Sequence, residues 1–409
     1  MTGGPKERKQ VFTGIGVTAP NGLGTEAWWQ ATLAGVSGIG PVTRFDASKY
    51  PATLAGEVPG FDVKEHIPSR LIPQTDHMTR LALTAAAEAL QDAAVDLEQL
   101  PQYAAGVVTA ASAGGFEFGQ RELEALWSKG GQHVSAYQSF AWFYAVNSGQ
   151  ISIRHGLRGP SGVLVTEQAG GLDAVAQARR QLRKGSLLMV TGGVDGSICP
   201  WGWTAQLTSG RLSTRDDPAR AYLPFGADAA GHVPGEGGAI LVLEDAEAAR
   251  ERGARVYGEL AGYAATFDPG PGRPGEPGLR RAAESALEQA GVTPDEVDVV
   301  FADGAGVPAL DRLEAEAITK VFGAGGVPVT VPKTLTGRLA AGGASLDLAA
   351  ALLSLRDAVI PPTADVGRLA EDCALDLVTA PRPRPVRTAL VLARGYGGFN
   401  AAAVVTAAR

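Results

Sequence analysis

Short apolar runs alternate with longer amphipathic segments along the whole chain. The runs combine β-branched and small apolar residues, which predicts buried strands of a parallel or mixed sheet. In the first part of the chain these runs occupy 10–17, 105–110, 162–166, 187–194 and 238–244. The longer segments place apolar residues at helical spacing and predict helices over 25–34, 79–93, 119–128 and 169–184.

The same alternation starts again after residue 250. Strands are predicted over 255–264, 297–302, 327–331, 387–393 and 400–407, and helices over 278–290, 309–322 and 343–357. We therefore predict an α/β protein with two similar βα-rich halves, over 8–250 and 255–409. No residue-level repeat relates the halves. The Pro- and Gly-rich stretch 266–278 predicts a surface loop.

Composition and charge exclude several classes of protein. The net charge of −7 argues against a nucleic-acid or anionic-membrane partner. The chain has no apolar run of about 18 residues and no secretory signal, so we expect no membrane span and a cytoplasmic protein. With only Cys199 and Cys373, neither a disulfide framework nor a metal cluster is expected, and no motif predicts a cofactor.

The segment VTEQAGGLDA at 165–174 predicts a strand that turns directly into a helix, with Gln168 at the corner. A side chain at such a corner lies over a helix N-terminus, where a Cys or Ser is activated as a nucleophile. An amide cannot serve as that nucleophile. Two interpretations are open: Gln168 is a polar turn residue, or it replaces a nucleophile in a former active site.

Several motifs together indicate a family. They are GVTAPNGLG at 16–24, TEQAGG at 166–171, FADGAG at 301–306, PKTLTGRL at 332–339 and ARGYGGFNAA at 393–402. On these motifs the chain resembles the β-ketoacyl synthases, and most closely the chain length factor, or ketosynthase β subunit, of bacterial type II polyketide synthases. The resemblance covers nearly the whole chain. It implies a thiolase-like fold with a layered αβαβα architecture.

The resemblance also implies that three chemical centres are changed. Active ketosynthases carry Cys at the elbow and His in two later motifs; this chain has Gln168, Asp303 and Arg338 there, and retains Lys333. Claisen condensation needs a thiolate and donors that stabilise an enolate. No His follows residue 232 to replace those donors. We therefore expect a catalytically silent subunit in which Asp303 and Arg338 pair, because an unpaired buried charge is costly.

The resemblance implies partners as well. They are an active ketosynthase α subunit in a heterodimer, an acyl carrier protein that acts mainly through that subunit, and a poly-β-keto chain in a shared tunnel. This chain would then set the length of the product in aromatic polyketide antibiotic biosynthesis. The alternative is an enzyme that decarboxylates malonyl-acyl carrier protein and so primes the synthase through Gln168.

The candidate gate of that tunnel is the helix that contains Phe116, Gly119 and Leu123, which lie about one turn apart. On pattern alone this face packs into the core; relatives use these positions to line the tunnel. Relatives that make octaketides carry bulkier Thr and Phe at the second and third positions, so Gly119 and Leu123 predict a decaketide-like or longer product. The aromatic stretch 139–148 predicts core, and the alternative that the resemblance implies is a subunit interface or tunnel wall.

Overall fold

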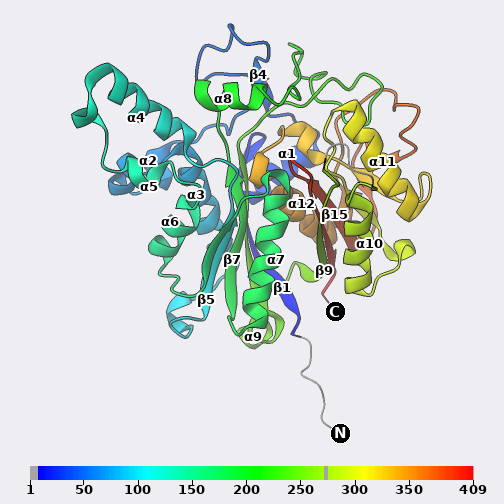
Figure 1. Cartoon of the computed structure of the whole chain (residues 1–409). Helices are drawn as coiled ribbons and strands as arrows, with labels where there is room; N and C mark the ends of the chain where they lie inside the picture. Colours follow the sequence, from blue (N-terminus) through cyan, green and yellow to red (C-terminus); the bar gives the residue numbers. More distant parts are fainter. Residues whose placement is uncertain (1–7, 271–274, 409) are drawn as a thin grey trace.

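The computed structural model describes residues 8–270 and 275–408 (Figure 1). Its centre is a mixed sheet. The first half contributes β1 (Gln10–Ala19), β5 (Ala105–Ala110), β6 (Ser161–Leu164), β7 (Leu188–Asp195) and β8 (Gly237–Asp245), with β2 (Gly22–Leu23) paired to β1. The second half contributes β9 (Gly258–Phe267), β10 (Val299–Phe301), β11 (Pro328–Thr330), β13 (Asp376–Leu377), β15 (Thr388–Arg394) and β16 (Phe399–Thr406).

The two halves of the sheet have the same strand order. From the outer edge inward, the first half runs β6-β5-β7-β8-β1 and the second runs β11-β10-β15-β16-β9, with β13 added outside β11. In both, the third of the five main strands lies outermost and the first lies at the centre. The halves join where β1 and β9 pair antiparallel, at Val11–Glu259 and Phe12–Gly258. That 8–250 and 255–409 are separate domains stays a prediction.

Helices form layers on and between these strands (Figure 1). Helices α7 (Gly170–Arg183) and α12 (Gly343–Asp357) lie in the middle, where α12 contacts both β8 and β15. Every residue of α12 from Gly343 to Ser354 is buried, as expected for a helix that packs between the two halves of the sheet. Helices α3 (His77–Asp92) and α6 (Val146–His155) cover the first half, and α10 (Leu279–Ala290) with α11 (Pro308–Phe322) covers the second. The predicted α/β thiolase-like layering is confirmed.

Helix α3 packs directly on strand β1 because that strand carries two glycines at the contact. A Cβ on Gly14 would lie 2.1 Å from the backbone oxygen of Ala89, and one on Gly16 would lie 2.0 Å from that of Ala85. Any larger residue would push the helix off the sheet. This close contact fixes the outer layer of the first half.

The remaining elements are short or lie outside the main sheet. They are α1 (Thr25–Leu33), α2 (Val63–His66), α4 (Phe116–Lys129), α5 (Gln138–Ala141), α8 (Pro200–Leu207), α9 (Ala246–Glu251), β3 (Ile39–Pro41), β4 (Leu54–Gly56), β12 (Val359–Ile360) and β14 (Arg382–Pro383). No helix among the described residues is long and apolar enough to cross a membrane.

The sequence prediction needs three adjustments. The gate helix α4 begins at Phe116 rather than at 119. Within 139–148, the core interpretation is wrong for Trp142, Phe143 and Tyr144, which are each about two-fifths exposed. The predicted loop 266–278 is a loop only after β9 ends at Phe267, and its residues 271–274 lie outside the described part of the chain.

Candidate functional site

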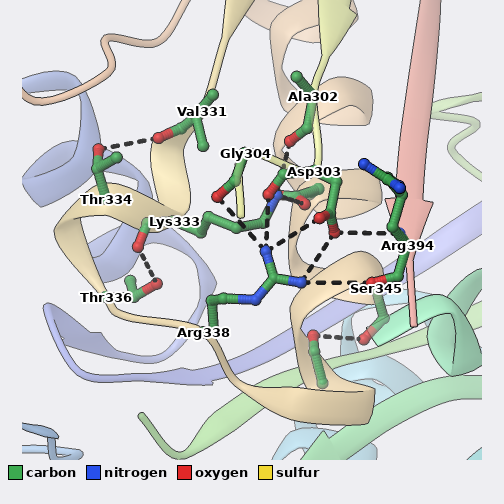
Figure 2. Close-up of polar contacts among 12 residues, drawn as sticks. Ala302, Asp303, Gly304, Val331, Lys333, Thr334, Thr336, Arg338, Ser345 and Arg394 are labelled. Atoms are coloured by element: carbon green, nitrogen blue, oxygen red, sulfur yellow. Dashed lines mark hydrogen bonds and ion pairs between the residues drawn. The ribbon is translucent and has the colours of Figure 1, made fainter. Parts of the chain in front are cut away.

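Asp303, Lys333 and Arg338 come together where two strands of the second half end. Asp303 follows β10, and Lys333 lies in a 3-10 turn after β11. Because β10 and β11 are parallel neighbours, their carboxyl ends lie at the same edge of the sheet. Arg338 follows the same turn and lies against Asp303 (Figure 2). This edge is where open α/β sheets place their ligand sites.

Arg338 and Asp303 form a buried, two-pronged ion pair (Figure 2). One terminal nitrogen of Arg338 lies 3.1 Å from Oδ2 of Asp303, and the other lies 3.1 Å from Oδ1. Asp303 is 2% exposed and Arg338 is 9% exposed. The predicted pairing of these two residues is confirmed.

Backbone groups fill the remaining hydrogen-bonding capacity of Arg338 and Asp303. Arg338 donates further hydrogen bonds to the carbonyl oxygens of Asp303, Gly304 and Arg394. Oδ1 of Asp303 also accepts from the backbone N–H of Arg394 at 3.1 Å. Burial alone would raise the pKa of Asp303, but the charges of Arg338 and Lys333 outweigh it and hold that pKa below its usual value.

Lys333 lies beside this pair and forms its own ion pair with an acid of helix α12. Its ammonium forms an ion pair with Asp347 and donates to the carbonyl oxygen of Ala302 at 2.8 Å. Both charged side chains are almost completely buried. Burial raises the pKa of Asp347 to about 6, in spite of the Lys333 charge. The retained lysine therefore ties the strand ends to the central helix.

Gln168 lies at the predicted elbow, in the 3-10 turn Glu167–Ala169 that leads into α7. Its side chain is 1% exposed, and neither the oxygen nor the nitrogen of its amide has a hydrogen-bond partner among the described residues. The amide packs on the start of α12, since a Cβ on Gly343 would lie 2.5 Å from Oε1 of Gln168. Gln168 makes no hydrogen bond to Asp303 or Arg338 within the described chain.

Glu167, which the sequence analysis did not single out, reaches the site instead. Its backbone has a left-handed φ of 51°, which is uncommon for a residue with a side chain. Oε2 accepts a hydrogen bond of 2.9 Å from the backbone N–H of Tyr396, in the glycine-rich loop after β15. Burial raises the pKa of Glu167, and the charge of Arg338 opposes that effect. The only feature of the sequence that could have indicated this role is an acidic residue directly before Gln168.

A cavity of about 480 Å³ lies over the Asp303–Arg338 pair. Its wall includes Glu167 and Phe116 but not Gln168. The base of the cavity is therefore formed by the paired charges of Asp303 and Arg338. The elbow position is Gln168, so no Cys or Ser stands there.

Helix α4 places the three predicted gate residues in different surroundings. The ring of Phe116 lies 4.5 Å from that of Trp201, centroid to centroid, and borders the cavity. Gly119 is buried below the same tryptophan, because an added Cβ would lie 3.1 Å from Cζ3 of Trp201. Leu123 is 38% exposed in the isolated chain. Trp142, which also approaches Gly119, belongs to the aromatic stretch 139–148, whereas Trp201 was not predicted from sequence.

Two family profiles match this chain. The N-terminal domain of β-ketoacyl synthases matches residues 8–249, and the C-terminal domain matches residues 257–367. The chain belongs to the β-ketoacyl synthase family. Among curated β-ketoacyl synthases, the tetracenomycin polyketide synthase ketoacyl synthase β subunit of Streptomyces glaucescens is 62% identical, over 97% of each chain. The 3-oxoacyl-[acyl-carrier-protein] synthase 2 of Coxiella burnetii is 32% identical, over 98% of this chain and 99% of that protein.

Solved structures of the family agree with this. The ishigamide ketosynthase/chain length factor superposes with a TM-score of 0.87 at 29% identity, covering 98% of this chain and 100% of the other. A type II PKS acyl-carrier protein in complex with its ketosynthase bound to the hexaketide gives 0.87 at 26% identity, with the same coverage. The resemblance to ketosynthase β subunits is therefore confirmed.

Proposed function

We propose that this chain is a non-catalytic chain length factor, which pairs with an active ketosynthase α subunit and sets the length of a polyketide. One observation carries the proposal: the buried Asp303–Arg338 pair fills the place where a ketosynthase needs neutral donors for an enolate. A guanidinium held by a carboxylate and three carbonyl oxygens has little donor capacity left for a substrate. The relatives named above support the same assignment.

The thiols of the chain support a silent subunit. Cys199 is 5% exposed and Cys373 is 3% exposed, and neither lines the cavity over the ion pair. Burial raises the pKa of the Cys199 thiol to about 11 and that of Cys373 to about 12. Both sulfurs are therefore protonated at neutral pH, and a protonated thiol is a poor nucleophile.

Decarboxylation of malonyl-acyl carrier protein is the second candidate. The observation in its favour is the unpartnered amide of Gln168, whose N–H groups are available to an enolate oxygen. Against it, the side chain is 1% exposed and is absent from the cavity wall. We therefore propose the silent subunit first.

An exposed apolar surface suits the proposed α subunit. Helix α4 projects from the body of the molecule (Figure 1) and contacts α5 and α8. These helices and the residues that follow α5 expose large apolar side chains: Leu123, Leu126, Trp127, Trp142, Phe143, Tyr144 and Trp201. Isolated subunits rarely expose so many large apolar residues on neighbouring elements unless a partner covers them. The predicted gate helix would then lie at the subunit boundary, where a shared tunnel for the poly-β-keto chain would pass.

Co-expression tests this function. The chain is produced with a ketosynthase α subunit, purified as a complex and supplied with malonyl-acyl carrier protein. We expect a one-to-one complex in which labelled acyl groups attach to the α subunit alone. Labelled acyl groups on this chain would contradict the proposal. Carbon dioxide release that persists in an α subunit lacking its Cys, and that stops with Gln168→Ala, would establish the decarboxylase instead.

A further inference from the structure

Helix α4, which carries the predicted gate residues, has few internal anchors. Of its 14 residues, all within the described part of the chain, three are buried: Phe118, Gly119 and Glu122. Its N-cap is Gly115, which has no side chain that could accept a hydrogen bond from the first turn. A helix of this length is only marginally stable in water by itself, so its position depends on the contacts made at its start.

Asp76, which directly precedes helix α3, supplies the missing cap. Its Oδ1 accepts a hydrogen bond of 2.9 Å from the backbone N–H of Met78 and so caps α3. Its Oδ2 accepts a hydrogen bond of 2.7 Å from the backbone N–H of Phe118, in the first turn of α4. One carboxylate therefore holds the N-terminal ends of two helices, and a carboxylate is favourable at both.

Gly115 lets the two helices come this close. A Cβ on Gly115 would lie 2.7 Å from the Cβ of Asp76, so any side chain there would push the start of α4 away from the carboxylate. Helix α3 in turn packs on strand β1 at Gly14 and Gly16. Asp76 therefore connects the projecting helix α4 to the central sheet through α3.

The carboxylate of Asp76 is costly to bury. Its side chain is 3% exposed, and its basic neighbours are bound elsewhere: His77 faces Glu236, and Arg80 donates to backbone carbonyl oxygens. Burial raises the pKa of Asp76 to about 6, and the two backbone N–H groups oppose that effect. A Ser or Thr would cap α3 without burying a charge. The carboxylate adds a second acceptor oxygen, and that oxygen is the one that reaches α4.

We propose that Asp76 is a positioning residue for the chain-length gate: it holds the first turn of α4, fixes where Phe116 and Gly119 lie, and so keeps the product to one length. Its hydrogen bond reaches Phe118, which lies between those two predicted gate positions. Asp76 is not among the described residues that line the cavity beside Phe116, so it acts through α4 and not by contact with the polyketide. This inference rests on the proposed length-setting function.

Asp76→Ser tests this role, because serine keeps a cap for α3 and removes the acceptor for α4. In the purified heterodimer, hydrogen–deuterium exchange measured by mass spectrometry should become about tenfold faster in α4, the loss expected for one hydrogen bond to a charged acceptor. Exchange in α10 should not change. The reconstituted complex should release a mixture of polyketide lengths, whereas the wild-type complex should release one predominant length. A merely structural role would lower the amount of product without changing the ratio of lengths.

Asp245→Ser is the matched control. Asp245 is 6% exposed and caps α9 by accepting from the N–H groups of Glu247 and Ala248, at the end of the molecule away from α4 (Figure 1). Its replacement should leave exchange in α4 and the product lengths unchanged. Asp76→Asn is a second variant that keeps the shape of the side chain but has one acceptor oxygen for two N–H donors. It should also mix the product lengths, to a smaller extent than Asp76→Ser.

Unchanged lengths in an active Asp76→Ser complex, or an equal mixture from Asp245→Ser, would overturn the inference. Exchange that rises as much in α10 as in α4 would also overturn it, because Asp76 would then stabilise the whole fold. Failure of both Asp76 variants to fold, beside a folded Asp245→Ser protein, would lead to the same conclusion. These results leave the length-setting function intact, whereas a wild-type chain that forms no complex contradicts that function instead.

Discussion

Each terminal nitrogen of Arg338 lies 3.1 Å from a different carboxylate oxygen of Asp303, and both side chains are buried. This geometry matches two N–H groups to two oxygens at once, which strengthens the pair and fixes its orientation. The pair itself adds little net stability, because removing both charges from water costs about as much as their attraction gains. Removing only one partner is costly, because it leaves a buried charge without a counter-charge.

Replacing one partner should therefore cost more than replacing both. Arg338→Met leaves the Asp303 carboxylate buried without its cation, and we expect the free energy of unfolding at pH 7.5 to fall by about 3–5 kcal/mol. Asp303→Asn combined with Arg338→Met removes both charges and should cost less than the single change. Denaturant unfolding of the wild-type protein, the single variant and the double variant measures these free energies. A double variant that is less stable than the single variant would contradict this prediction.

The loss in Arg338→Met should depend on pH. In the native protein the pKa of Asp303 lies below its usual value, so its stabilising contribution is present above about pH 4 and is lost as the pH falls further. Without Arg338, burial raises that pKa, and Asp303 takes up a proton and becomes neutral at higher pH. The difference in unfolding free energy between the two proteins should therefore shrink from pH 7.5 to pH 5. A constant difference would show that Asp303 stays charged.

Removing the amide of Gln168 should stabilise the protein. A buried amide without a partner costs about 1–3 kcal/mol, and Met fills nearly the same volume without polar groups. We expect Gln168→Met to raise the free energy of unfolding by about 1 kcal/mol and to leave the product of the complex unchanged. A loss of product with normal stability would give Gln168 a chemical role.

Filling the space at Gly119 should shorten the polyketide. A Cβ there lies 3.1 Å from Trp201, so Gly119→Thr displaces that ring or narrows the space beside it. We expect products shorter by one or more extender units, measured by mass spectrometry of the reconstituted complex. Gly40→Thr is the matched control, because an added Cβ there meets no atom within 4 Å. Unchanged length in an active complex would remove this position from the gate.

The thiols should resist alkylation. With pKa values raised by burial to about 11 for Cys199 and about 12 for Cys373, the thiolate fraction at pH 7.5 is below about one in a thousand. We expect iodoacetamide to modify neither residue in the native protein within an hour, and both after unfolding. Intact-mass spectrometry detects this. Rapid modification of the native protein would contradict the burial of these sulfurs.

The sequence was sufficient for the long strands of the main sheet, for most long helices and for one key contact, but not for α6 or α8. Strands such as β5 and β8 are buried along their whole length, so they appear as unbroken apolar runs. The pairing of Asp303 with Arg338 was predictable because two opposite charges replace neighbouring site residues and neither can be buried alone. The spacing of apolar residues thus predicted the strands and helices that form the layers. The two opposite charges predicted the contact at the centre of the site.

What could not be predicted depends on contacts between distant segments and on backbone conformation. Glu167 reaches the loop at Tyr396 only because its φ is left-handed, and no local pattern reports that angle. Trp201 covers Gly119 from an element some eighty positions later. For Trp142, Phe143 and Tyr144 the sequence left core and interface both open, and the folded chain decides between them by exposing their side chains.

The Asp303–Arg338 pair also bears on the history of this protein. Restoring a ketosynthase would require a change at Gln168 and at both charged positions. A first step that reverts either charge alone leaves the other stranded in the interior, and the protein loses much of its stability before any activity returns. Each single change at Asp303 or Arg338 is therefore expected to cost stability, so the two positions are best changed together.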